Sequence, residues 1–211
     1  MGPHEGQRVE SAGRPLAEAS AAMILVHGRG AGPTNILELA DLLPHPEFAY
    51  LAPAASGGTW YPYSFMADIP KNEPGISSGL GVLRGLVDRV LESGISREKI
   101  VLAGFSQGAC LMSEFAVRNA ARYGGALAFS GGVIGPPGTS WEYDGDFAGM
   151  PFFLGCSNVD PHIPIARVEE TSALLARMGA LIEKRIYPGM GHLINDDEIA
   201  YARTLVASVG G

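Results

Sequence analysis

The sequence predicts an α/β fold with a mostly parallel central sheet and helices on both faces. From residue 21 onward, short apolar runs alternate with longer amphipathic segments, which is the pattern of parallel strands joined by crossover helices. The chain has 211 residues, of which 46% are hydrophobic, and this length fits one domain with a substantial core. We therefore divide it into a polar N-terminal extension, 1–20, and a single domain, 21–211.

Six apolar runs are the predicted strands, because each is too short and too rich in apolar or β-branched residues to be a typical helix. They are residues 21–27, 48–52, 99–105, 125–129, 151–156 and 181–187. Apolar residues at helical spacing predict helices between them, around 36–43, 76–90, 109–117 and 165–178. A last helix is predicted to begin after Asn195, a good N-cap residue followed by three acidic residues. In the extension, at most Gln7–Glu10 is predicted to form an edge strand.

Composition excludes several classes of protein. Glycine and proline together make up about a fifth of the chain, which is below the level of a low-complexity protein. The net charge is −7 and the basic residues are scattered, so nucleic acid is not an expected partner. The apolar run Ala21–Val26 is too short to span a membrane, and we expect a cytoplasmic protein. Cys110 and Cys156 lack metal-type spacing and are expected to be buried free thiols, so no metal site is predicted.

Ser106 is the candidate nucleophile. It lies at the centre of Gly104–Gly108, the only Gly-x-Ser-x-Gly motif in the chain. The motif directly follows a predicted buried strand and opens a predicted helix, as a nucleophile elbow requires. Its glycines let strand and helix approach closely, so the hydroxyl is presented at the end of the sheet. The alternative is an ordinary strand-to-helix turn that contains a serine.

His192 is the candidate base, because a serine hydroxyl needs a base and the base needs an orienting group. It lies between the last predicted strand and the last helix, over the carboxyl ends of the strands, where Ser106 also lies. His162 is an alternative base, but it is more simply a residue at the rim of the site.

Asp160 is the candidate acid. In hydrolases with this serine motif, the acid falls between the serine and the histidine in the sequence. Asp160 follows the predicted strand 151–156 and so reaches the same edge of the sheet. Asp144 and Asp146, on a long loop, are the alternatives.

Negative charge that develops on a substrate carbonyl oxygen needs fixed hydrogen-bond donors. We expect these to be the backbone N–H groups of Gln107, which follows the candidate nucleophile, and of Arg29, in the glycine-rich loop 27–32. That loop lacks the Lys-Ser/Thr of a phosphate-binding loop and the full spacing of a dinucleotide fingerprint, so nucleotide binding is the weaker alternative.

Together the segments LVHGRGA, GFSQGA, DPHIP and GMGH resemble the carboxylesterase, phospholipase and acyl-protein thioesterase family of small α/β-hydrolases. The resemblance covers residues 20–209 and implies a compact α/β-hydrolase fold without a separate cap domain. It also implies a cofactor-free hydrolase of carboxylic esters or thioesters. In that family, the matching residues are Ser106 as nucleophile, His192 as base, Asp160 as acid, and the backbone of Arg29 and Gln107 as oxyanion hole.

Two departures from the thioesterase branch of this family bear on the substrate. That branch usually reads His-Gly-Leu-Gly-Asp where this chain has the segment 27–31, and its acyl-binding loop is longer than the loop before Trp60. We therefore expect a carboxylesterase that acts on a small-molecule ester with a short to medium acyl chain. The Arg29 side chain is expected either to favour an acidic group in the substrate or to form a surface ion pair.

Two long loops, 52–74 and 131–150, carry aromatic residues and are predicted to be functional; the alternative is ordinary packing over the sheet. With the loop that carries Asp160, they are expected to form an apolar acyl pocket. The predicted pocket residues are Trp60, Tyr61, Tyr63, Phe65, Val133, Trp141, Tyr143 and Ile163. Three alternative functions stay open: a thioesterase or lysophospholipase, a lactone (dienelactone-type) hydrolase, and a binding module for a small hydrophobic ligand. A homodimer also stays open.

Overall fold

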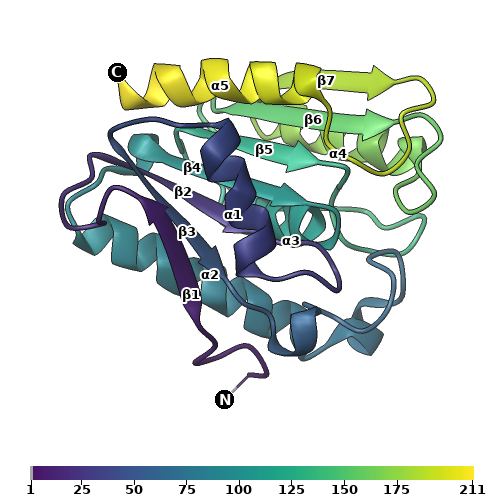
Figure 1. The fold of residues 1–211 in the computed structure, drawn as a ribbon. Coiled ribbons are helices and arrows are strands. Elements are labelled where there is room, and N and C mark those ends of the chain that lie inside the picture. Colours follow the sequence, from purple (N-terminus) through teal and green to yellow (C-terminus); the bar gives the residue numbers. More distant parts are fainter. Residues whose placement is uncertain (1) are drawn as a thin grey trace.

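The computed structural model describes residues 2–211 and shows one seven-stranded sheet flanked by α-helices (Figure 1). The strands are β1 (Val9–Gly13), β2 (Ala21–Val26), β3 (Phe48–Pro53), β4 (Ile100–Phe105), β5 (Gly125–Phe129), β6 (Pro151–Ser157) and β7 (Leu181–Tyr187). The helices are α1 (Pro33–Leu42), α2 (Gly75–Glu92), α3 (Gln107–Arg118), α4 (Ile165–Arg177) and α5 (Asp196–Gly210). The strand order is β1-β3-β2-β4-β5-β6-β7. All neighbouring strands are parallel except β1 and β3, so the predicted fold class is confirmed.

Helices cover both faces of the sheet, and each face has its own hydrophobic core. Met23 and Leu25 of β2 pack with residues of α1 and α5, whereas Ile24 and Val26 pack with residues of α2, α3 and α4. In Figure 1, α1 lies in front of the sheet, and α2 and α3 lie behind it. Because both faces are covered, the inner strands are buried along their length, which explains why they are continuously apolar in sequence.

The element boundaries agree with the sequence to within a few residues. Asn195 caps α5 as predicted: its side chain accepts a hydrogen bond from the Glu198 N–H, and the Glu198 carboxylate accepts one from the Asn195 N–H. The edge strand is Val9–Gly13, not Gln7–Glu10, because its partner β3 ends at Pro53, which pairs with Val9. None of the helices within 2–211 is long and apolar enough to cross a membrane.

The long loops contain little regular structure. Loop 52–74 has two short 3₁₀ turns, Ser56–Gly58 and Ile69–Asn72, and loop 131–150 has no helix or strand. Cys110 and Cys156 are buried and free, as expected. The parallel strands β2, β4, β6 and β7 all end at the same edge of the sheet, and the four predicted site segments follow these ends.

Candidate active site

Ser106 occupies a sharp turn between β4 and α3. Its backbone has φ 55° and ψ −121°, a conformation that is strained for a non-glycine residue and persists only where neighbours hold it. The Ser106 N–H donates to the Phe129 carbonyl oxygen of β5 at 3.0 Å. A Cβ on Gly108 would lie 2.1 Å from the Val26 carbonyl oxygen. Only glycine therefore lets α3 approach β2 closely enough to hold this turn.

Ser106, His192 and Asp160 form a hydrogen-bonded chain. His192 Nε2 lies 2.8 Å from Ser106 Oγ, and His192 Nδ1 lies 2.7 Å from Asp160 Oδ2. The Asp160 side chain is completely buried, and that of His192 is 18% exposed. Since a carboxylate only accepts hydrogen bonds, His192 Nδ1 carries a proton and Nε2 is left to accept from the serine hydroxyl. The candidate nucleophile, base and acid are therefore joined in that order by hydrogen bonds.

The Asp160 carboxylate is held in its charged form. Burial by itself would raise the pKa of this carboxyl, but the hydrogen bond from His192 and those from the backbone N–H groups of His162 and Ile163 outweigh it. The two backbone bonds to Oδ1 measure 2.8 and 3.0 Å. The pKa of Asp160 therefore lies below its ordinary value, as suits a group that must stay negative beside an imidazole.

The alternative base and acids do not join this chain. The His162 ring is exposed and stands edge-on to the His192 ring, with 4.8 Å between centroids. Asp146 accepts a hydrogen bond from the Ala148 N–H in its own loop. Asp144 lines a separate hollow between α4 and loop 131–150.

The backbone N–H groups of Arg29 and Gln107 have no hydrogen-bond acceptor within residues 2–211. Both residues line the same cleft as Ser106. Gln107 is the first residue of α3, where a helix leaves its N–H groups unpaired and its dipole is positive. The two donors are free to bind an oxygen that carries developing negative charge.

The Gln107 side chain and the N-terminal extension fix the loop beside these donors. Gln107 Oε1 accepts from the Trp60 N–H at 2.9 Å, and Gln107 Nε2 donates to the Tyr61 carbonyl oxygen at 2.8 Å. His4 is buried and bridges the same loop, since its Nε2 donates to the Trp60 carbonyl oxygen and its Nδ1 accepts from the Ser56 N–H. We did not single out His4 from the sequence, because nothing in its polar surroundings marks it as buried.

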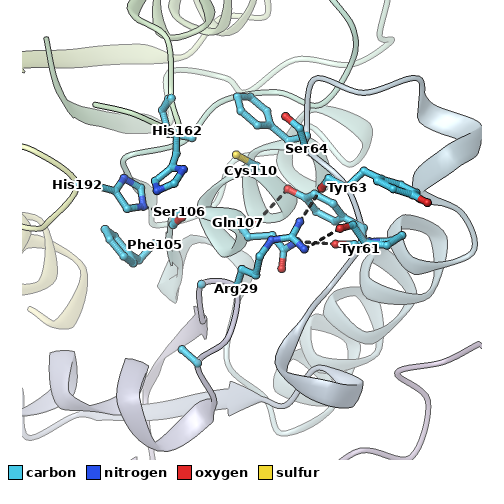
Figure 2. A pocket seen from close by; sticks show the side chains of 15 residues that line it. Arg29, Tyr61, Tyr63, Ser64, Phe105, Ser106, Gln107, Cys110, His162 and His192 are labelled. Carbon is cyan, nitrogen blue, oxygen red and sulfur yellow. Dashed lines mark hydrogen bonds between the residues drawn. The ribbon is translucent and has the colours of Figure 1, made fainter. Parts of the chain in front are cut away.

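The Arg29 side chain binds backbone carbonyl groups of the neighbouring loop. Its guanidinium donates to the backbone carbonyl oxygens of Pro62 and Tyr63, at 2.8 and 2.6 Å (Figure 2). The predicted surface ion pair is wrong, since Arg29 pairs with no carboxylate of residues 2–211. The side chain instead ties the glycine-rich loop to loop 52–74. A preference for acidic substrates stays a prediction.

A cleft of about 470 Å³ opens beside Ser106. Four of the predicted pocket residues line it: Tyr61, Tyr63, Phe65 and Ile163. His162, which we expected at the rim of the site, also lines it, as do Phe105 and Cys110, which we did not predict. Cys110 lies one helical turn after Ser106, so the helical period counted from Ser106 was the signal for it. Burial raises the pKa of its thiol to about 12, which leaves the wall uncharged.

The prediction was wrong for the other four pocket residues, because none of them lines this cleft. Trp60 is completely buried behind it and donates its indole N–H to the His27 carbonyl oxygen. Val133 is also completely buried.

The remaining two, Trp141 and Tyr143, lie along the other hollow with Asp144. Tyr143 donates its hydroxyl to Glu114 Oε1 at 2.7 Å, and the Trp141 indole donates to the Ile134 carbonyl oxygen at 3.0 Å. These hydrogen bonds to α3 and to loop 131–150 hold the two aromatic side chains outside the cleft that contains Ser106.

The fold, the turn at Ser106 and the cleft at the strand ends define an α/β-hydrolase. The phospholipase/carboxylesterase family profile matches residues 4–209, so the chain belongs to this family and is a carboxylic ester hydrolase.

Three relatives illustrate the range of this family. The crystal structure of a phospholipase/carboxylesterase from Dyadobacter fermentans is 40% identical, superposes with a TM-score of 0.93, and covers 98% of this chain and 99% of its own. Acyl-protein thioesterase 1 of Debaryomyces hansenii is 26% identical over 96% of this chain and 95% of its own length. Lysophospholipase-like protein 1 of Mus musculus is 24% identical over 88% and 85%, respectively.

Proposed function

We propose that this protein hydrolyses carboxylic esters with short to medium acyl chains through an acyl-enzyme on Ser106. Ser106 Oγ attacks the ester carbonyl carbon while His192 Nε2 takes the hydroxyl proton. The N–H groups of Arg29 and Gln107 bind the resulting oxyanion. The bond to the alcohol then breaks, and His192 passes its proton to the leaving oxygen.

Water completes the reaction. It attacks the acyl-enzyme carbonyl as His192 removes one of its protons, and His192 passes this proton to Ser106 Oγ when the carboxylic acid is released. Asp160 holds the imidazole in the required tautomer and stabilises its charged form. The observation that carries the proposal is the continuous hydrogen-bonded chain from Ser106 to Asp160, with bonds of 2.8 and 2.7 Å.

The shape of the cleft supports the acyl-length assignment. Tyr61, Phe65 and Ile163 form an apolar wall, and Cys110, which is 1% exposed, closes the cleft on the side of α3. A volume of about 470 Å³ is in the lower half of the range for ligand pockets. For p-nitrophenyl esters we expect kcat/KM to peak at or below about eight acyl carbons. A maximum at palmitate would overturn this assignment.

The nucleophile is tested with Ser106→Ala. We expect hydrolysis of p-nitrophenyl butyrate to fall by about 10⁴-fold or more, and a fluorophosphonate probe to label the unaltered protein at Ser106 but not the variant. An unchanged melting temperature would show that the variant is folded. Turnover retained by a folded variant would contradict the mechanism. Absence of labelling in the unaltered protein would favour a binding module.

A substrate panel separates the related activities. Oxygen esters, thioesters, lysophospholipids and lactones of matched acyl length are compared by kcat/KM. We expect oxygen esters to give the highest values, and a preference for another class would reassign the substrate while leaving the role of Ser106 intact.

A further inference from the structure

A second hollow lies beside the catalytic cleft, between α1 and the segment that follows His192. Its volume is about 560 Å³, and we call it the α1 groove. Its apolar wall consists of Ile36, Leu39, Leu42, Leu193 and Ile194. Leu42 and Leu193 are 43% and 46% exposed, although large aliphatic side chains are usually covered. The groove therefore presents an apolar surface that the chain itself does not fill.

The α1 groove adjoins the cleft. Gly28, Ala31, Phe105 and His192 line both hollows, whereas Ser106 lines only the cleft.

Figure 2 shows where two of the shared residues lie relative to Ser106. His192 and Phe105 lie on one side of Ser106. Tyr61 and Tyr63 lie on the other side, where the cleft extends. His192 thus stands between the serine and the α1 groove.

Ester hydrolysis assigns different halves of the substrate to these two spaces. The acyl group stays bonded to Ser106 Oγ until water releases it, so it must lie in the hollow that Ser106 lines. The alcohol oxygen receives its proton from His192, so the alcohol lies against the imidazole and departs on that side. We propose that the α1 groove binds the alcohol part of the ester, which makes leaving-group size a determinant of specificity. The proposal rests on the mechanism through Ser106.

The lining indicates an uncharged, apolar alcohol. Asn35 Oδ1 is occupied by the Gly32 N–H at 3.2 Å, and Glu38 is an exposed carboxylate at the rim. The five aliphatic side chains supply the apolar contact surface, while a carboxylate at the rim disfavours an anionic leaving group. The chemical class is a primary alcohol with an aliphatic or aromatic tail.

The test measures kcat/KM for two series of esters. In the first, the acyl group is butanoyl and the alcohol grows from methanol to octanol; in the second, the alcohol is ethanol and the acyl chain grows. For the unaltered protein we expect kcat/KM in the alcohol series to rise about twofold for each added methylene, as for a chain half covered by the groove. Leu193→Ser and Leu42→Ser should flatten that rise, whereas the dependence of kcat/KM on acyl length in the second series should keep its slope.

The controls separate the groove from general damage. Leu181→Ser makes the same change at an exposed leucine. Leu181 is the first residue of β7, at the end of the strand away from the site, and its substitution should alter neither series. Deacylation of a preformed butanoyl-enzyme, followed by stopped flow, should be the same in the groove variants and the unaltered protein, because the alcohol has already left. A loss of catalytic geometry would instead slow deacylation.

The outcomes are distinguishable from failure of the proposed function. If Ser106→Ala still hydrolyses the esters, the mechanism fails, and the groove assignment with it. If hydrolysis depends on Ser106 but kcat/KM is flat across the alcohol series, or the groove variants keep the slope, only the groove assignment is overturned. Light scattering that shows a dimer which Leu42→Ser dissociates would likewise overturn it, because a second copy would then cover the groove.

Discussion

Glu198 leads to a specific prediction about stability and pH. Its side chain is completely buried in the first turn of α5. Oε2 accepts the Asn195 N–H at 2.8 Å, but Oε1 has no hydrogen-bond partner among residues 2–211. Burial, reinforced by the neighbouring charge of Asp197, outweighs the Asn195 bond and raises the pKa of Glu198 to about 7 from its ordinary value of 4.5.

The raised pKa makes the folded state lose stability as pH rises. Between pH 4.5 and about 7 the folded protein keeps a proton on Glu198 that the unfolded chain has released, so the free energy of unfolding falls with increasing pH in this window. The stabilisation is complete below the unfolded pKa and is lost above the folded one. The pKa difference corresponds to about 3 kcal/mol, at 1.36 kcal/mol per tenfold change in the ionisation constant.

The substitution Glu198→Gln tests this directly. The amide keeps an oxygen for the Asn195 N–H and cannot ionise, so any cost of burying it is the same at all pH values. We expect urea denaturation at pH 5 and pH 8 to show that the unaltered protein loses about 2.5 kcal/mol more than the variant over this interval, because pH 5 already lies above the unfolded pKa of 4.5. Glu92→Gln, at an exposed site at the end of α2, is the matched control. A difference between Glu198→Gln and the unaltered protein of less than about 1 kcal/mol would refute the reasoning.

Three further substitutions test the site and its supports. Asp160→Asn should lower kcat by about 10⁴-fold with little change in KM, because the amide favours the wrong imidazole tautomer; a loss below about tenfold in steady-state assays would contradict this role. Gly108→Ala should destabilise the fold by about 2 kcal/mol or more, because its Cβ would lie 2.1 Å from the Val26 carbonyl oxygen. Gly81→Ala, with open space around its Cβ position, should not lower the melting temperature, and equal effects of the two would reject the packing argument. His4→Ala should lower the free energy of unfolding by about 1–2 kcal/mol by leaving buried backbone groups unpaired; an unchanged urea midpoint would show that the extension does not secure the loop.

The fold could be predicted because its strands are buried on both faces. A strand such as β4 is apolar along its whole length, and this pattern is visible without knowledge of its neighbours. The edge strand β1 lacks such a pattern, since four of its five residues are polar or small and its extent depends on where β3 ends. Its position was therefore the least well predicted.

The acyl wall was predicted only in part, because aromatic residues have the same appearance in sequence whether they line a cleft or a core. Tyr61 and Phe65 lie at the cleft, yet Trp60, beside Tyr61 in the chain, is completely buried behind it. Tyr143 lies outside the cleft because its hydroxyl donates to the carboxylate of Glu114, which is 29 residues earlier in the chain, on α3. Such a partner is brought near only when α3 and loop 131–150 pack together.

The sequence by itself determined the sheet, the order of the chemical groups along it and the edge where they meet, because short-range patterns encode strands and parallel strands bring their ends together. Only the tertiary structure decided which side chains line the cleft, what the Arg29 guanidinium holds, and that His4 is buried. These contacts join segments as far apart as His4 and Ser78. They depend on distances in three dimensions that no local pattern of residues specifies.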